Sequence, residues 1–484
     1  MNKKLIIHLL GAIMLIEALA MAPSLAISLI YGDGDWPALL IPMGILIVLG
    51  APAWLLVRSQ DKANMRPRDG FVTVALAWIQ LSVFGALPFM LSGFLPHFAD
   101  ALFETVSGFT TTGATVVQSF DNLPHGIMFW RSFTHWIGGM GVLVLTLALL
   151  PKMTGRTSHL MRAESPGPSF SKIVPKLGDS AKILYLIYGV MTVLMWLLLM
   201  WPGGMNAYDA AIHALGTAGT GGFSNYALSV GAFESLAVDI IITVFMVLFG
   251  VNFALYFRML IGDWKSVWKS EELRWYLGIY GLSVLIVSGI ITPEYGSFLK
   301  ALRYGSFQIA SIMSTTGYAT ANFDLWPQAA RMLIVILLFV GACAGSTAGG
   351  IKMVRVALLC KLGRREIRRT FQPRKMQVLR FEGKGVEETM LMQVATFFAV
   401  YILLILSGAF LLSLENSFDL TTNLTAAITA VSNVGPGLGA VGPMGSFAGY
   451  SDFSKFVFSF LMLCGRLELF PILALFHPAI WQKG

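Results

Sequence analysis

Long apolar runs alternate with short polar connections along most of this chain. A helix needs roughly 20 residues to cross a hydrocarbon core about 30 Å thick, and ten runs are close to or above that length. They cover residues 5–30, 37–58, 71–93, 126–150, 181–201, 233–261, 274–292, 329–360, 388–413 and 453–478. The pattern predicts an all-α polytopic membrane protein. The first run follows Lys3 and Lys4, but it is too long for a signal peptide and a second run follows at once.

Four of the connections share one order of elements. Each holds a weakly polar stretch that is too short to span, followed by a tract centred on a glycine. The stretches are Asp100 to Phe109, Tyr208 to Ala218, Phe298 to Ser314 and Leu420 to Ser432. The glycines are Gly113, Gly222, Gly317 and Gly435, which recur at intervals of roughly 100 residues. Because irregular backbone is tolerated at membrane depth only inside protein or beside a cavity, each stretch is predicted to be a re-entrant half-helix that leads into a loop.

This order predicts two N-terminal spans plus four span/half-helix/filter-loop/span repeats around a pseudo-fourfold pore. The two N-terminal transmembrane helices occupy residues 1–68, and the pore repeats occupy residues 69–160, 161–265, 266–384 and 385–484. The third repeat is expected to have a broken last helix. No separate soluble domain has room to fold.

Charge predicts the orientation of the chain. Basic connections hold Arg58 to Arg68, Lys152 to Lys182, Arg258 to Arg274, and Lys352 to Lys384. They are every second connection, so they share the cytoplasmic side, and both termini are expected there too. The other connections carry Asp33, Asp35, Asp100, Glu104, Asp121, Asp209, Asp324, Glu415 and Asp419. An acidic outer mouth of this kind would concentrate cations.

Composition supports a membrane location and excludes other classes. The 484 residues are 56% hydrophobic and 12% charged, with a mean hydropathy of +0.71. The net charge of +8 does not predict nucleic-acid binding, because the lysine and arginine residues lie at the ends of apolar spans. The three cysteines lie in or beside apolar runs and indicate neither a disulfide framework nor a metal cluster.

The glycine tracts have the chemistry of an ion filter. Rings of backbone carbonyls can replace the hydration oxygens of an alkali cation without a fixed charge. A loop that turns successive carbonyls toward one axis needs residues that accept positive φ, which glycine does without steric cost. Each half-helix would point the negative end of its dipole at the cation. Close helix packing is the alternative role for any one glycine, but four tracts at matching places favour the filter.

Several segments together resemble a known family. The four loop segments are GFTTTGAT (108–115), TGGFS (220–224), STTGYAT (314–320) and SNVGPGLG (432–439), and three others are FWRSFTHWIGGMGVLVL (129–145), GSTAGGIK (345–352) and GRLELF (465–470). They are similar to the filter loops and neighbouring segments of the TrkH/KtrB/HKT superfamily of potassium transporters. The two extra N-terminal spans favour the TrkH type. The resemblance covers nearly the whole chain.

The resemblance implies potassium uptake through a channel-like filter in the cytoplasmic (inner) membrane of a bacterium. It assigns the potassium site to Thr111, Thr112, Gly113, Thr220, Gly221, Gly222, Thr315, Thr316, Gly317, Asn433, Val434 and Gly435. Some relatives have serine in place of the first glycine and conduct sodium, so Gly113 favours potassium. Gly221 and Val434 depart from the Thr-Thr-Gly pattern, which predicts unequal coordination and less strict selectivity.

The resemblance also implies partners. These are a second copy of the chain in a homodimer, the membrane lipid, and a cytosolic TrkA-like nucleotide-binding ring that regulates gating. K⁺ is the transported ion, and no organic cofactor is expected. The basic stretch Lys361 to Lys384 would contact anionic lipid or this ring.

The eighth run contains a cluster of small residues that predicts a break in the helix, because each glycine weakens a helix by roughly 1 kcal/mol relative to alanine. Similarity to TrkH implies that this segment is a gate below the filter. The gate residues are Gly345, Ser346, Thr347, Ala348, Gly349, Gly350 and Lys352, together with Arg466. A tight helix contact is the alternative for the small residues.

Arg466 lies in the last apolar run, where arginine costs about 2.5 to 3.5 kcal/mol on insertion scales. It should therefore face protein or water. We expect it to project toward the pore and limit cation occupancy; a structural ion pair between helices is the alternative. His135, near the start of the fourth run, is expected to be a packed polar residue, because no second histidine stands at metal-ligand spacing.

Two other functions remain open. An ion-coupled potassium symporter that works by alternating access also uses broken helices and repeats, but tandem repeats with all filter loops on one side do not match inverted ones. A membrane enzyme would need acid, base, nucleophile or metal groups that converge at membrane depth. The polar residues within the runs are mainly Gly, Ser and Thr, so the chain is not expected to be an enzyme.

Overall fold

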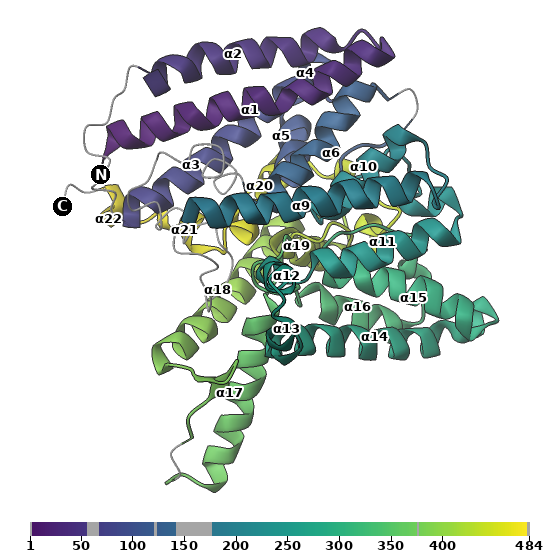
Figure 1. Cartoon of the computed structure of the whole chain (residues 1–484), viewed down its shortest axis with the longest axis vertical. Helices are drawn as coiled ribbons and strands as arrows, with labels where there is room; N and C mark the ends of the chain where they lie inside the picture. Colours follow the sequence, from purple (N-terminus) through teal and green to yellow (C-terminus); the bar gives the residue numbers. More distant parts are fainter. Residues whose placement is uncertain (1, 56–66, 121–122, 142–176, 375–376, 482–484) are drawn as a thin grey trace.

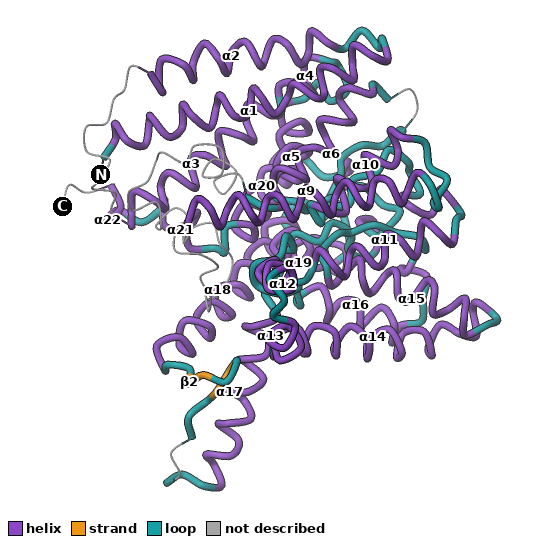
Figure 2. Tube along the Cα trace, in the orientation of Figure 1, coloured by secondary structure: helices purple, strands orange, loops and turns teal. Residues whose placement is uncertain are grey.

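The computed structural model describes residues 2–55, 67–120, 123–141, 177–374 and 377–481. These residues are mostly helical, as Figure 2 shows. The all-α prediction is confirmed for them, apart from a two-stranded hairpin of β1 (Arg380–Phe381) and β2 (Lys384–Gly385). The basic residues Arg58, Lys62, Arg66 and Lys375, most of the Lys152 to Lys182 connection, and Asp121 lie outside the described residues.

Six helices are long and apolar enough to span a membrane, or seven if one bent pair counts as a span. They are α1 (Lys3–Tyr31), α2 (Trp36–Leu55), α3 (Pro67–Gly85) with α4 (Leu87–Leu91), α9 (Leu177–Met200), α14 (Glu271–Tyr295) and α18 (Glu388–Ser413). Apolar side chains cover their outer faces: on α9, Leu186 is 68% exposed and Val190 58%. A lipid-facing surface explains this exposure.

Four shorter helices lie in the interior of this group. They are α5 (Phe98–Phe109), α10 (Ala207–Ala218), α15 (Phe298–Met313) and α19 (Leu420–Ser432). Their bounds agree with the four predicted half-helices to within about two residues, and most of their residues are buried. Side-chain caps start two of them: Asn206 accepts the N–H of Asp209 at 2.8 Å, and Asp419 accepts that of Thr422 at 3.2 Å.

The helices that follow the glycine tracts are short; the sequence predicted a break in the eighth run but continuous spans over residues 233–261 and 453–478. They are α6 (His125–Gly139), α11 (Leu236–Phe249), α16 (Gln328–Leu338) and α20 (Asp452–Arg466), of 15, 14, 11 and 15 residues. Residues 142–150 of the fourth run lie outside the described part. In the other three runs the helix stops well before the predicted end of the run, at Phe249, Leu338 and Arg466.

Local features mark the breaks that follow α11 and α20. α11 and α12 (Phe253–Leu260) meet at 93°, where Asn252 begins the second helix by accepting the N–H of Ala254 at 2.9 Å. α20 ends before Glu468 and Leu469, which have φ of 55° and 67° and so leave the helical region. The predicted break in the eighth run is confirmed, since α16 ends at Leu338 and the next helix begins at Met353.

One helix leaves the body of the molecule. α17 (Met353–Phe371) runs crosswise to α14 and extends well past it at the lower edge of Figure 1. The hairpin of β1 and β2 lies beside it (Figure 2). The short helices α13 (Trp264–Lys269), α21 (Phe470–Ala474) and α22 (Pro478–Trp481) complete the described α-helices. Four 3₁₀ helices are also described: η1 (Ser229–Phe233), η2 (Phe323–Leu325), η3 (Gly439–Val441) and η4 (Phe447–Gly449).

Candidate functional site

The four glycine tracts adopt one backbone conformation. The first residue of each tract is left-handed: φ is 56° at Thr111, 55° at Thr220, 58° at Thr315 and 54° at Asn433. The glycine two positions later also has positive φ, with values of 77°, 80° and 80° in the first three tracts and 101° at Gly435. Alternation of this kind turns successive carbonyls toward one side. The second tract therefore matches the others despite Gly221, and only the fourth differs measurably.

The same hydrogen bond ties each tract to its half-helix. The residue in the middle of the tract donates its N–H to a carbonyl near the end of the preceding helix. The four bonds are Thr112 to Ser107 at 2.9 Å, Gly221 to Gly216 at 2.8 Å, Thr316 to Ser311 at 2.9 Å and Val434 to Thr429 at 3.0 Å. Since only backbone atoms take part, these bonds do not depend on the side chain in the middle position.

The four tracts contact one another in cyclic order. A Cβ atom placed on Gly113 would overlap the carbonyl oxygen of Gly221, and one on Gly222 would overlap that of Thr316. A Cβ on Gly317 would overlap the carbonyl oxygen of Val434, and one on Gly435 would lie 2.7 Å from that of Thr112. Each glycine is therefore packed against the middle carbonyl of the next tract, and the fourth closes on the first. Only glycine fits these close approaches.

All four central glycines line one cavity of about 260 Å³. The half-helices end at this ring, so their partially negative carbonyl ends point toward it. Carbonyl rings with such dipoles can coordinate a monovalent cation that has lost part of its water. The predicted filter residues are thus brought together at one place in the fold.

The predicted acidic outer mouth is not found at this cavity. Its described lining residues include no carboxylate and one charged side chain, Arg131. Glu104 and Asp209 are 0% and 4% exposed and are used internally. Asp209 accepts hydrogen bonds from Asn225 at 2.5 Å and Tyr226 at 2.7 Å. Burial, with the hydrogen bond to this carboxylate, raises the pKa of Tyr226 to about 12, so its phenol stays protonated as the donor.

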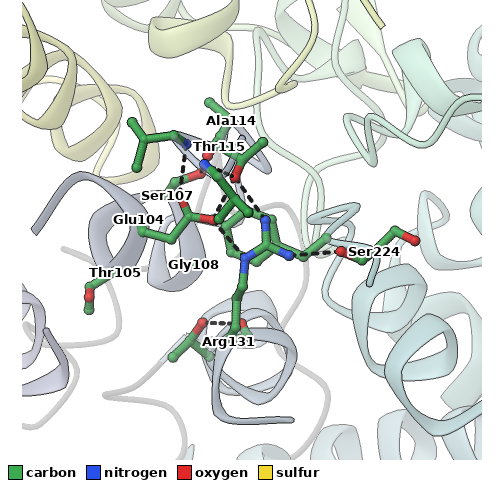
Figure 3. Close-up of polar contacts among 12 residues, drawn as sticks. Glu104, Thr105, Ser107, Gly108, Ala114, Thr115, Arg131 and Ser224 are labelled. Atoms are coloured by element: carbon green, nitrogen blue, oxygen red, sulfur yellow. Dashed lines mark hydrogen bonds and ion pairs between the residues drawn. The ribbon is translucent and has the colours of Figure 1, made fainter. Parts of the chain in front are cut away.

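A buried ion pair between Arg131 and Glu104, drawn in Figure 3, contacts the residues that follow the first and second tracts. Nε of Arg131 is 2.6 Å from Oε1 of Glu104, and the two side chains are 1% and 0% exposed. The guanidinium also donates to the carbonyl of Ser224 at 3.0 Å and to the hydroxyl of Thr115 at 3.1 Å. Its carbon lies 3.5 Å from the centre of the Phe223 ring. The Arg131 side chain therefore links the segment after the first tract to the segment after the second tract.

Glu104 completes this connection. It accepts the hydroxyl of Thr115 at 2.8 Å and the N–H of Val116 at 2.9 Å (Figure 3). Every polar atom of the pair has a partner, as burial of two charges requires. Sequence reasoning missed the pair; the available signal was an arginine in the fourth apolar run, which needs a buried partner.

His135 is a packed polar residue, as predicted, but it also links two tracts. Its Nδ1 donates to the carbonyl of Gly108 at 2.8 Å, and its Nε2 accepts the N–H of Phe223 at 3.3 Å. The ring is fully buried, and each of its two nitrogens has a hydrogen-bond partner. His135 thus holds the end of α5 against the second tract.

The small-residue segment between α16 and α17 contacts Thr315, Ser432 and Asn433, which do not line the cavity at the central glycines. The N–H of Gly349 donates to the hydroxyl of Thr315 at 2.7 Å. A Cβ atom on Gly349 would lie 2.5 Å from the carbonyl oxygen of Ser432 and 2.9 Å from Cβ of Asn433. The segment therefore touches the third and fourth tracts. The buried ammonium of Lys352 donates to the carbonyl of Ala348 within the segment itself.

Arg466 lies at the same level, at the end of α20. Its guanidinium donates to Thr347 O at 2.8 Å, to Thr111 Oγ1 at 3.3 Å and to Gly139 O at 2.6 Å, and also to Gly138 O. Glu468 instead forms an ion pair with Arg355, at 2.6 and 3.1 Å. A positive charge therefore lies among the first tract, the small-residue segment and the end of α6.

Substitution of Arg131 by lysine should destabilise the fold, because lysine keeps the charge but loses the planar group that reaches three partners. Damage to a buried ion pair lowers the free energy of unfolding by about 3 to 5 kcal/mol. We therefore expect a lower unfolding temperature for the purified protein in detergent. Arg303→Lys is the matched control: it pairs with Asp239 at 2.7 Å but is 25% exposed, which limits its loss to about 1 kcal/mol. Equal unfolding temperatures for the two variants would contradict this structural role.

Comparison with known proteins covers the whole chain. The TrkH family model, described as a cation transport protein, matches residues 37–281 and 297–483. The Trk system potassium uptake protein TrkH of Halomonas elongata is 35% identical over 502 residues, and that of Escherichia coli K12 is 35% identical over 489 residues; each alignment covers 100% of both chains. The crystal structure of the potassium transporter TrkH from Vibrio parahaemolyticus matches with a TM-score of 0.90 and 33% identity over 100% of both chains.

Proposed function

Because this chain belongs to the TrkH family of cation transport proteins, we propose that it takes up potassium ions through the ring of four glycine tracts. The family resemblance predicted from the sequence is confirmed, and the chain is a multi-pass membrane protein of this family. The observation that carries the proposal is the closed cyclic packing of Gly113, Gly222, Gly317 and Gly435 on the carbonyls of neighbouring tracts. Such a ring offers oxygens to a potassium ion from four sides.

Each of the four proposed pore repeats contributes one loop to this ring. Residues 1–68 supply two helices outside it, and residues 69–160, 161–265, 266–384 and 385–484 each supply one half-helix and one filter loop. The ring is built from backbone carbonyls, which coordinate the transported K⁺ without any organic cofactor or enzymatic group. Loops one to three have nearly the same φ values, and Gly435 differs by about 20°, so the fourth loop is the source of any unequal coordination.

The segment 345–350, with Lys352 and Arg466, is the proposed gate. It is supported by the bond from Gly349 to Thr315 and by the bonds from Arg466 to Thr111 and Thr347. In this proposal, backbone and a positive charge directly below the filter both oppose cation passage. With a gate of this kind, the pore conducts ions only when the segment moves away from the tracts.

Partners and orientation complete the proposal. The relatives are named as Trk system proteins, which supports a cytosolic TrkA-like regulatory ring at the basic side of the membrane. The α17 arm projects beyond the body (Figure 1) and supports contact with a second copy in a homodimer. We place the chain in the bacterial inner membrane with both termini in the cytoplasm.

The direct test is rubidium uptake in a bacterial strain that lacks its own potassium uptake systems. Cells that express the chain should take up rubidium well above the empty vector. Gly113→Ser should shift uptake toward sodium, since a Cβ at this position displaces the Gly221 carbonyl. Uptake at the level of the empty vector, with correctly inserted protein, would exclude the proposal.

A potassium symporter remains the alternative, and single-channel recording separates the two mechanisms. Discrete current steps of channel size are expected from a continuous filter. Alternating access moves only a few ions per conformational cycle and would give no such steps.

A further inference from the structure

Glu272, in the first turn of α14, holds both ends of the proposed gate segment. Its Oε1 atom accepts the N–H of Ala344 at 2.7 Å and the N–H of Val354 at 3.2 Å. Ala344 directly precedes residues 345–350, and Val354 lies in the first turn of α17. The side chain is buried, at 8% exposure. One carboxylate oxygen therefore fixes the entry and the exit of the segment relative to each other.

The segment makes further bonds with its surroundings on this side. The N–H of Cys343 donates to the carbonyl of Gly250 at 3.0 Å, and the N–H of Phe253 donates to the carbonyl of Gly345 at 3.1 Å. Both partners flank the break between α11 and α12. The start of the segment is thus held by backbone-to-backbone bonds, whereas the Glu272 side chain supplies an acceptor that reaches both ends.

Glu272 is itself connected to the cytoplasmic hairpin. Glu382 lies in the turn between β1 and β2, and its Oε1 atom accepts the N–H of Glu271 at 2.8 Å, the N–H of Glu272 at 3.2 Å and the hydroxyl of Ser270 at 2.9 Å. A carboxylate at this end of a helix is stabilised by the helix dipole. The N–H of Glu382 in turn donates to Glu271 at 3.2 Å. Hydrogen bonds therefore run without interruption from the hairpin, through the start of α14, to the segment.

A small polar cavity adjoins this connection. It has a volume of about 220 Å³ and is lined by residues that include Asn252, Arg258, Glu272, Ala344, Glu382 and Lys384. Space beside the carboxylate allows the Glu272 side chain to change position without overlap with packed atoms. A tightly enclosed side chain could not release the segment in this way.

We propose that Glu272 is a positioning residue that holds segment 345–350 in its obstructing conformation, and that the β1–β2 hairpin is the cytoplasmic element through which this hold is released. This inference rests on the proposed gate function of the segment. When the hairpin moves, Glu382 withdraws from the start of α14, the Glu272 side chain shifts, and the N–H groups of Ala344 and Val354 lose their common acceptor. The segment is then free to leave the tracts.

The test uses single-channel recordings of the full-length protein in lipid bilayers. Glu272→Ala removes the two hydrogen bonds to Oε1, so we expect the open probability to rise at least about fivefold with an unchanged unitary current. Glu272→Gln keeps one acceptor oxygen but replaces the carboxyl group with an amide, and it should give a smaller rise; it also serves as the variant of choice if the alanine variant does not fold. Glu294→Gln, at the opposite and exposed end of the same helix, is the matched control and should match wild type.

A double variant distinguishes this role from general destabilisation. In a chain without residues 345–350, Glu272→Ala should produce no further rise, because the segment that it holds is absent. An additional rise in that background, or wild-type open probability in both single Glu272 variants, would overturn the positioning role. If the deletion alone leaves the flux unchanged, then the gate proposal fails; if the deletion raises the flux and the Glu272 variants do not, then only the present inference fails.

Discussion

Deletion of residues 345–350 is expected to increase rubidium flux through the protein by roughly thirtyfold. The deletion removes the bond from Gly349 to Thr315 and the bond from Arg466 to Thr347. At about 1 kcal/mol each, these bonds favour the obstructed state by about 2 kcal/mol, which corresponds to that factor in the ratio of open to closed molecules. Rubidium uptake into vesicles that contain the purified variant measures the effect.

A leak around the protein must be separated from flux through the filter. The deletion combined with Gly222→Ala provides this control, because flux through the ring should then disappear while a leak through damaged protein would persist. Unchanged rubidium flux in a well-folded deletion variant would show that the segment does not obstruct the pore.

Gly222→Ala alone is expected to reduce rubidium uptake by at least about tenfold, since coordination by a carbonyl ring depends on where its oxygens lie. Gly222 has φ of 80°, and a Cβ atom there would overlap the carbonyl oxygen of Thr316. The neighbouring tract must move away, which displaces one of the oxygens that face the ion. Uptake by intact cells, normalised to the amount of protein in the membrane, measures the loss.

Gly204→Ala is the matched control for this substitution. Gly204 also has positive φ, at 72°, but no heavy atom lies within 4 Å of a Cβ built there. Both variants carry the conformational cost of alanine in the left-handed region, about 1 to 2 kcal/mol, and only Gly222→Ala also disturbs the ring. Similar uptake by the two variants would argue against a filter at this place.

The sequence was most informative where local chemistry determines the structure. The half-helix bounds could be predicted because each half-helix ends a few residues before a glycine with positive φ, as α15 does before Gly317. The break after Leu338 could also be predicted, because a cluster of glycines disfavours helix. These features depend on a residue and its immediate neighbours.

Features that depend on distant partners could not be predicted. The break at Asn252 lies within an apolar run, and it is stabilised in part by a bond from Cys343 to Gly250. Glu104 was assigned to an acidic mouth because its partner Arg131 lies 27 positions away on another helix. The pairing of Glu468 with Arg355 spans 113 positions, so the sequence offered no local sign of it.

The closed ring of tracts determines how variants of this chain behave when one cell makes two of them. All four tracts belong to one polypeptide, and each packs on the next in a fixed order. A cell that makes two versions of this chain therefore assembles two kinds of complete ring and no hybrids, even when the chains associate in pairs. In the proposed filter, selectivity is then a property of each molecule separately, and one loop can differ from the others, as the fourth does in having Val434 at its middle position and φ of 101° at Gly435.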